Sequence, residues 1–120
     1  MGKRLRFLII DDDMGDQILI QKAIRKNGMD VDIETASTGT MGIAKANALN
    51  PDVVVLDSAM PGMDGFEACR TIKAMKSDIK IIICTGSIDG GVPDKAKAVG
   101  ADGCCLKTSD YLGLIQMLQS

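Results

Sequence analysis

The chain has 120 residues, the size of one compact domain and too few for two independent hydrophobic cores. Apolar residue types make up 46% of the chain and charged types 25%, a balance that excludes a disordered polypeptide. A net charge of −2 and an aromatic content of 2% argue against a protein that binds nucleic acid or an anionic membrane surface.

The N-terminal stretch carries basic residues at positions 3, 4 and 6, but only four apolar residues follow before an acidic triplet. A secretory signal peptide needs a longer apolar segment, and no apolar run approaches the roughly 20 residues that cross a bilayer. We therefore expect this stretch to be the solvated entry to a first strand, and the protein to be cytoplasmic and not bound to a membrane.

Five short apolar segments begin at residues 5, 31, 53, 79 and 103, so their starts lie 26, 22, 26 and 24 residues apart. Stretches with helical periodicity separate them. In the first such stretch the apolar face carries Ile20, Ala23 and Ile24; in the third it carries Phe66, Cys69, Ile72 and Met75. Strands that alternate with helices at this spacing indicate βαβ units and a parallel sheet.

The character of each segment predicts its place in the sheet. Residues 7–10, 53–56 and 79–84 are almost continuously apolar, which is typical of strands covered by helices on both faces. Residues 31–36 alternate apolar and polar side chains, and residues 103–106 are very short, so both segments suit sheet edges. We predict a flavodoxin-like, doubly wound α/β fold with five helices and parallel strand order 2-1-3-4-5, forming a single domain over residues 1–120.

Local signals predict several helix ends. Asp13 is expected to cap the first helix and Thr38 the second, and Asn50 followed by Pro51 is expected to end the second. The final helix is expected over residues 109–119.

The cysteines are Cys69, Cys84, Cys104 and Cys105. Three of them lie in apolar segments, and the adjacent pair would point to opposite faces of a strand. The chain has no histidine and no Cys-x-x-Cys pair, so a zinc site is not supported. We expect buried free thiols.

Polar residues directly follow or end four of the predicted strands: Asp11 and Asp12 after the first, Asp57 after the third, Thr85 after the fourth and Lys107 after the fifth. The carboxyl ends of parallel strands share one edge of the sheet, so these side chains should converge beside the switch in strand order. Clustered carboxylates repel one another, and an oxygen-only donor set suits Mg²⁺ or Mn²⁺. The ammonium and the hydroxyl could then contact a phosphoryl group, toward which a carboxylate can act as nucleophile.

This order of residues resembles the receiver domain of bacterial two-component response regulators, in particular the single-domain chemotaxis regulators, over nearly the whole chain. The matching segments are residues 7–13 (FLIIDDD), 51–57 (PDVVVLD), 60–65 (MPGMDG), 84–86 (CTG) and 100–103 (GADG) ahead of Lys107.

The resemblance implies that Asp57 is the phosphoacceptor. It also implies that Mg²⁺ or Mn²⁺ binds at Asp57, directly to Asp12 and through water to Asp11, with the backbone carbonyl of Ala59 as a further ligand. Such a domain phosphorylates and dephosphorylates itself as a switch rather than turning over a substrate as an enzyme.

The resemblance further implies that Lys107 pairs with the acyl phosphate and that Thr85, followed by Gly86, is the switch hydroxyl at the phosphate site. The donor would be a phosphohistidine of a histidine kinase or phosphotransfer protein. The partner that receives the signal would be a downstream effector protein or an output domain outside this chain. Pairing with a second copy as a homodimer is a further expected interaction. No contact with nucleic acid or membrane is implied.

The chain departs from the family pattern at a few positions. Thr108 follows the lysine where the family usually has proline, and Cys104 occupies the usual site of a tyrosine or phenylalanine. A cis bond without proline costs about 2.5–4 kcal/mol, so we predict a trans Lys107–Thr108 bond and a reshaped loop. Ala59 and Ser87 offer no acid or carboxamide to orient water, which predicts slow to moderate autodephosphorylation.

Other function classes are open at this point. The departures at Thr108 and Cys104 motivate a receiver-like docking module that works without phosphorylation. A flavodoxin-like electron carrier would need a loop rich in Ser, Thr and Gly after the first strand, where this chain has three acids. A phosphatase with an aspartate nucleophile would need a second acid at the position of Ala59.

Overall fold

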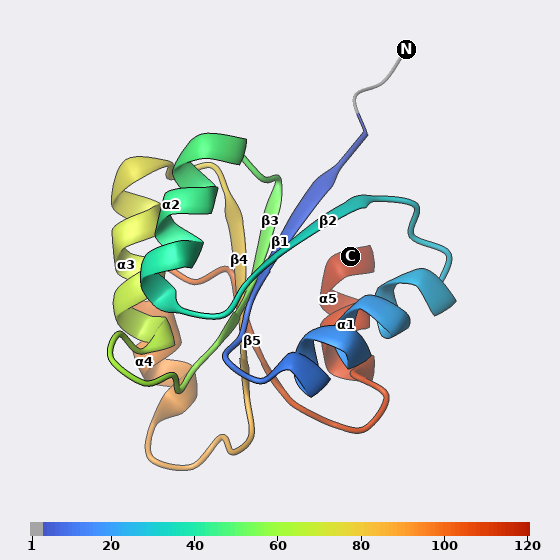
Figure 1. Ribbon diagram of the computed structural model, residues 1–120. Helices are drawn as coiled ribbons and strands as arrows, with labels where there is room; N and C mark the ends of the chain where they lie inside the picture. Colours follow the sequence, from blue (N-terminus) through green and yellow to red (C-terminus); the bar gives the residue numbers. More distant parts are fainter. Residues whose placement is uncertain (1–3) are drawn as a thin grey trace.

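The computed structural model describes residues 4–120, which form five strands and five helices in strict alternation (Figure 1). Residues 1–3, part of the predicted basic strand entry, lie outside the described residues. The strands are β1 (Arg6–Ile10), β2 (Asp32–Ala36), β3 (Val53–Asp57), β4 (Lys80–Thr85) and β5 (Gly103–Leu106). The helices are α1 (Met14–Lys26), α2 (Gly39–Leu49), α3 (Gly65–Met75), α4 (Val92–Ala98) and α5 (Leu112–Gln119).

All five strands pair in parallel in the order β2-β1-β3-β4-β5, which confirms the predicted fold class and strand order. The central strands β1, β3 and β4 are buried almost throughout, because helices cover both of their faces. Strand β2 alternates exposed and partly buried residues, as its predicted edge position requires. The strands begin within one residue of the predicted apolar segments.

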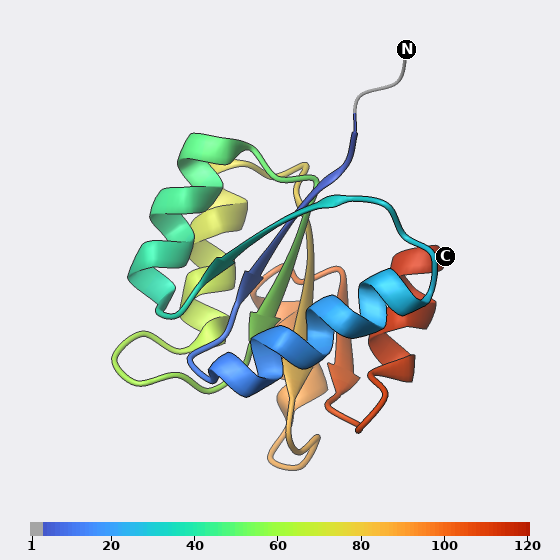
Figure 2. The same ribbon diagram turned by 45° about the vertical axis from the view of Figure 1, so that its right-hand side comes forward.

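Helices cover the sheet in two layers: α2, α3 and α4 lie on one face, and α1 and α5 lie on the other (Figures 1 and 2). Successive side chains of a strand point to opposite faces, so each strand contributes to two cores. Leu8 and Ile10 pack on the side of α2 and α3, whereas Phe7 and Ile9 pack on the side of α1 and α5. Burial on both faces therefore makes the central strands the rigid base of whatever lies at their ends.

The helix ends follow the predicted signals. The Asp13 carboxylate accepts a hydrogen bond from the backbone N–H of Asp16 and caps α1. The Thr38 hydroxyl accepts from the backbone N–H of Met41 and caps α2, which ends at Asn50 in a left-handed conformation with φ of 48°. These contacts satisfy backbone donors that a helix leaves free at its start.

Two predicted features differ from the structure. Helix α5 begins at Leu112, three residues later than expected, because Tyr111 adopts a φ of 52° that a right-handed helix cannot accommodate. The side chain of Asp110 accepts the backbone N–H of Leu112 at the start of this helix. The apolar face of α3 is buried only as far as Ile72, because Met75 at the helix end is 42% exposed.

The predicted free thiols are confirmed, since all four cysteines are unbridged and three are buried. Cys104, the fourth, is half-buried, and it packs on the α2, α3 and α4 side while Cys105 packs on the opposite side. The sulfur of Cys105 lies 3.0 Å from that of Cys84, its direct partner on the neighbouring strand. Burial raises the pKa of the Cys69 thiol to about 11.

Within residues 4–120, no helix has both the length and the apolar character that a membrane span requires.

The loop from β3 to α3 is built by specific residues. Met60 is buried in the core, and Gly62 has a φ of 81°, which favours glycine. Asp64 caps α3 by accepting the backbone N–H of Glu67 at 2.9 Å. Gly65 donates its backbone N–H to the Ser58 oxygen at 3.0 Å, which closes the loop against the end of β3.

We predict that Gly65→Ala destabilises the fold by about 2–3 kcal/mol. A Cβ at this position would overlap the backbone oxygen of Asp57 and lie 2.9 Å from the Cα of Ser58, so the end of β3 or the start of α3 has to move. Urea unfolding measures the loss. Gly86→Ala is the matched control, because a Cβ there meets open space. Equal midpoints for the two variants would contradict the predicted close packing of α3 on β3.

Candidate functional site

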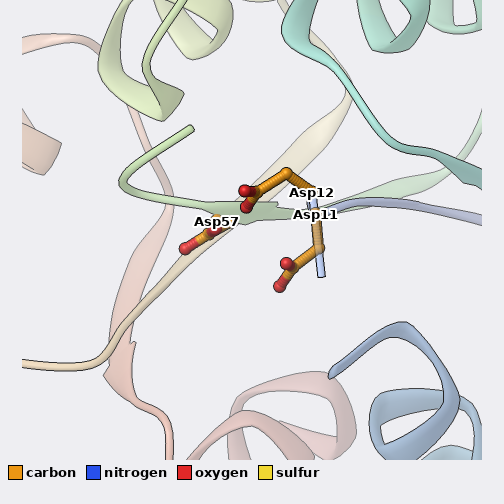
Figure 3. Close-up of side chains that lie close together, drawn as sticks. All are labelled: Asp11, Asp12 and Asp57. Atoms are coloured by element: carbon orange, nitrogen blue, oxygen red, sulfur yellow. The ribbon is translucent and has the colours of Figure 1, made fainter. Parts of the chain in front are cut away.

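The carboxyl ends of β1 and β3 bring three carboxylates together (Figure 3). Asp11 and Asp12 directly follow β1, and Asp57 is the last residue of β3. One carboxylate oxygen from each lies within 4.8 Å of the others. Because β1 and β3 are neighbours at the switch in strand order, the convergence expected from the sequence follows directly from the topology.

Asp11 is the most firmly held of the three, with 1% of its surface exposed. Its backbone N–H donates to the Ala36 oxygen, which continues the pairing of β1 with β2 by one residue. Its carboxylate accepts the backbone N–H of Asp13 at 2.9 Å, and its own carbonyl accepts the Gln17 side-chain amide at 2.7 Å. The start of α1 therefore holds both the backbone of Asp11, through Gln17, and its carboxylate, through the Asp13 N–H.

Lys107 brings the positive charge from β5 to this edge. Its backbone N–H donates to the Thr85 oxygen at 2.7 Å, which extends the pairing of β4 and β5 beyond Leu106. The ammonium nitrogen lies 2.8 Å from Asp11 and 3.3 Å from Asp57. The same nitrogen lies 2.8 Å from Asp16 on α1, so three carboxylates share one ammonium.

Burial and mutual repulsion perturb these groups. Burial, followed by the charge of Asp11, raises the pKa of Asp57 from 3.8 to about 6, although Lys107 opposes the shift. Burial also raises the pKa of Asp11 despite its hydrogen bond to Lys107. Burial alone would lower the pKa of the Lys107 ammonium, but its hydrogen bonds to Asp11 and Asp16 outweigh that effect and raise it. The site therefore carries an excess of negative charge that a cation would relieve.

The remaining predicted residues lie at the same sheet edge. Thr85, at the end of β4, is 4% exposed, and its hydroxyl donates to the backbone oxygen of Ser87 at 2.7 Å. Ala59 and Gly86 are exposed in the loops that follow β3 and β4. The structure thus brings Asp11 and Asp57 into contact with Lys107 and places Asp12 beside them, while the Thr85 hydroxyl is engaged within its own loop.

The departures from the family pattern have visible consequences. The Lys107–Thr108 bond is trans, as predicted, since residues 4–120 contain no cis peptide bond. The loop that follows is held by the Thr108 hydroxyl, which donates to Asp110 at 2.9 Å, and by the Tyr111 N–H, which donates to the Thr108 oxygen at 3.2 Å. These contacts lead the chain into α5 without a proline.

Sequence reasoning missed three residues around the site. Asp16 pairs with Lys107, and Gln17 holds Asp11 from the first turn of α1. Tyr111 is buried beside the site, where burial and the charge of Asp16 raise the pKa of its hydroxyl. The position of the Asp13 cap is a usable signal, because it puts residues 16 and 17 on the turn of α1 next to the strand ends.

We predict that Asp57→Asn stabilises the metal-free protein at neutral pH by about 1–2 kcal/mol, less than the full pKa shift implies because partial solvation screens it. The folded pKa of Asp57, about 6, exceeds its ordinary value of 3.8, so the folded state binds this proton more tightly than the unfolded state. The contribution of Asp57 to the free energy of unfolding therefore falls as pH rises from about 4 through about 6.

Urea unfolding of both proteins in the presence of a chelator, between pH 4 and 7.5, measures this difference. The gap between the variant and the wild type should widen across that interval and level off above it, because the amide carries no charge at any pH. A gap that is constant with pH would show that Asp57 ionises normally in the folded protein.

Comparison with known proteins places this architecture in a family. Residues 7–119 match the family model described as the response regulator receiver domain. The chain is 32% identical over 120 residues to response regulator GacA of Pseudomonas viridiflava, covering 97% of this chain but 53% of that protein. The chain thus spans about half the length of that curated relative.

Shorter relatives align along most of their length. The chemotaxis protein CheY of Listeria monocytogenes is 33% identical over 103 residues, with 86% of each chain covered. The crystal structure of response regulator TrrA from Thermotoga maritima, in complex with Mg²⁺-BeF, superposes with a TM-score of 0.85 at 28% identity and 96% coverage of each chain. The fold, the family match over nearly the whole chain and these relatives agree: the chain belongs to the response regulator receiver domains, the phosphoacceptor domains of two-component signalling.

Proposed function

We propose that Asp57 is the residue that accepts the phosphoryl group, from a phosphohistidine of a histidine kinase or phosphotransfer protein. The observation that carries this assignment is the convergence of Asp57 with Asp11 and Asp12 beside the Lys107 ammonium. Asp57 ends a strand that is buried along its whole length, so its carboxylate is held rigidly at the edge of the sheet. The domain extends over residues 1–120.

In the proposed transfer, a carboxylate oxygen of Asp57 forms a bond to phosphorus while the bond from phosphorus to the donor nitrogen breaks. The imidazole keeps the electron pair of that bond and takes up a proton, and Asp57 becomes an acyl phosphate. The Lys107 ammonium lies 3.3 Å from the attacking carboxylate, where it can stabilise the charge of the transferred oxygens. The residues of this chain thus act by positioning and electrostatics.

The donor set fits Mg²⁺ or Mn²⁺, because it offers carboxylate oxygens and no nitrogen or sulfur ligand. Asp11, Asp12 and Asp57 would hold the ion, together with the backbone carbonyl of Ala59. When bound, the ion neutralises the crowded carboxylates and shares the charge of a phosphoryl group. The binding of Mg²⁺-BeF to the relative TrrA supports this proposal.

Thr85 and the adjacent Gly86 complete the phosphate site. The Thr85 hydroxyl donates to the Ser87 oxygen, so contact with a phosphoryl group requires it to exchange that partner. This exchange would move the loop after β4 and alter the surface near α4, where the half-buried Cys104 takes the place of a rotating aromatic ring.

Phosphorylation adds roughly −1.5 to −2 charges at the site. The altered surface would then bind a downstream effector protein, an output domain of a longer chain, or a second copy as a homodimer. The cytoplasm is the proposed location, where the kinase would meet this domain.

Intact-mass measurement tests the role of Asp57 as phosphoacceptor. Incubation with acetyl phosphate and Mg²⁺ should add one phosphoryl group to the wild type, measured by intact mass, and none to Asp57→Ala. A chelator should abolish the gain, because the carboxylates then repel the anionic donor. Asp52→Ala is the control, since this acid lies at the opposite end of β3.

Failure of the wild type to gain a phosphoryl group while it still binds Mg²⁺ would overturn the assignment. That result would favour the alternative of a docking module that works without phosphorylation, with the loop at Lys107 and Thr108 as the first place to look for the cause.

The residue at position 59 bears on the lifetime of the acyl phosphate. Ala59 is exposed two residues after Asp57 and has no group that can orient an attacking water. We expect Ala59→Asn to shorten the phosphoryl half-life by about tenfold, a change of about 1.4 kcal/mol in the barrier, as measured by the decay of the phosphorylated mass after donor removal. Ala98→Asn, on the exposed surface of α4, is the control. An unchanged half-life for Ala59→Asn would show that this position does not limit access of water.

A further inference from the structure

Three carboxylates surround the Lys107 ammonium, and two of them, Asp11 and Asp16, accept hydrogen bonds from it. Its nitrogen lies 2.8 Å from an oxygen of Asp11, 2.8 Å from an oxygen of Asp16 and 3.3 Å from an oxygen of Asp57. An ammonium has three N–H groups and no acceptor. Asp11 and Asp16 already engage two of these groups, so a phosphoryl group that takes more than one hydrogen bond from Lys107 has to displace one of the two carboxylates.

The three partners differ in how readily they can leave. Asp11 is 1% exposed and is fixed by the Asp13 backbone N–H and the Gln17 amide. Asp57 carries the phosphoryl group itself in the proposed reaction. The side chain of Asp16 is 30% exposed on the first turn of α1, where water can replace the lysine as its partner.

We propose that Asp16 is a positioning residue for phosphoryl transfer, which holds the Lys107 ammonium in the unphosphorylated domain and competes with the phosphoryl group for it. This inference rests on the proposed function of Asp57 and Lys107. Asp16 therefore opposes phosphorylation by occupying a donor of Lys107 that a phosphoryl oxygen would otherwise use.

The same exchange links the reaction to α1. Asp16 belongs to the first turn of this helix, and its ion pair with Lys107 ties α1 to the end of β5. Release of Asp16 on phosphorylation removes that link, while the Asp13 cap and the Gln17 contact continue to hold the helix start.

The sequence offers a matched control for a general charge effect. Glu67 occupies the first turn of α3, as Asp16 occupies that of α1, and it is exposed. Neutralising either acid removes one negative charge near a helix start, where acids stabilise the helix dipole. Of these two acids, Asp16 is the one that contacts Lys107. An effect transmitted through the ammonium should therefore appear in the Asp16 variant and not in the Glu67 variant.

The test compares Asp16→Asn and Glu67→Gln with the wild type. At saturating Mg²⁺, the affinity for beryllofluoride, an analogue of the phosphoryl group, is measured by calorimetry, and the rate of phosphorylation by acetyl phosphate is measured by intact mass. Asp16→Asn should bind beryllofluoride about two- to fivefold more tightly and react faster by a similar factor, the range of a partly exposed ion pair. Glu67→Gln should change neither quantity by more than about 1.5-fold.

A double-mutant cycle with Lys107→Met shows whether Asp16 acts through the lysine. If it does, Asp16→Asn has at most a marginal effect on beryllofluoride affinity in the Lys107→Met background. An equal gain in both backgrounds would overturn the inference, because Asp16 would then act by its charge alone. Unchanged or weaker binding by Asp16→Asn in the otherwise wild-type protein would overturn it too.

The remaining controls separate this inference from the proposed function. Asp16→Ala, a second neutral variant, should shift the affinity in the same direction, and urea unfolding verifies that each variant is folded. If the wild type is phosphorylated on Asp57 and both Asp16 variants behave like it, the role of Asp16 is wrong and the proposed function stands. If the wild type is not phosphorylated, the proposed function itself fails.

Discussion

The crowding of like charges at the end of β3 is the constraint on which the site depends. Asp11, Asp12 and Asp57 have carboxylate oxygens within 4.8 Å of one another, and Asp11 and Asp57 are almost fully buried. Such an arrangement is unfavourable unless positive charge offsets it. Lys107 supplies one such charge, but burial, followed for Asp57 by the charge of Asp11, still raises the pKa of both carboxyls. The uncompensated charge is what makes the site suited to a divalent cation and a phosphoryl group.

The buried parallel sheet offsets the repulsion between these carboxylates. Strands β1, β3 and β4 are buried on both faces, so the hydrophobic cores on either side stabilise backbone positions that the charges alone would push apart. The helix starts and loops at the same edge then supply the orienting contacts. Gln17 holds Asp11, and the close approach of Gly65 closes the loop against Asp57. The buried central strands therefore stabilise the fold, and the residues at their carboxyl ends supply the reactive groups.

Acids at the opposite edge of the sheet are bound differently from the three clustered carboxylates. Asp52 accepts the backbone N–H of Arg6 at 2.8 Å, and Asp102 accepts that of Ile81 at 2.8 Å while pairing with Lys73. Each of these carboxylates caps the amino end of a strand and is satisfied by donors of the chain itself. The carboxylates at the carboxyl edge face one another instead, because strand polarity directs backbone N–H and C=O groups differently at the two edges.

The sequence by itself determined most of the architecture. Apolar runs of the observed lengths and spacing require a parallel α/β sheet, and the alternation in β2 requires an edge, because side-chain burial follows directly from local pattern. It also indicated the residues at the strand ends, since parallel strands end together. Only the tertiary structure decided that Asp16 shares Lys107, that Tyr111 delays the start of α5, and that the Thr85 hydroxyl turns to Ser87. The ion pair depends on packing between elements 91 residues apart in the chain. The other two outcomes depend on which of several reachable conformations a loop adopts, and the local residue pattern does not specify that choice.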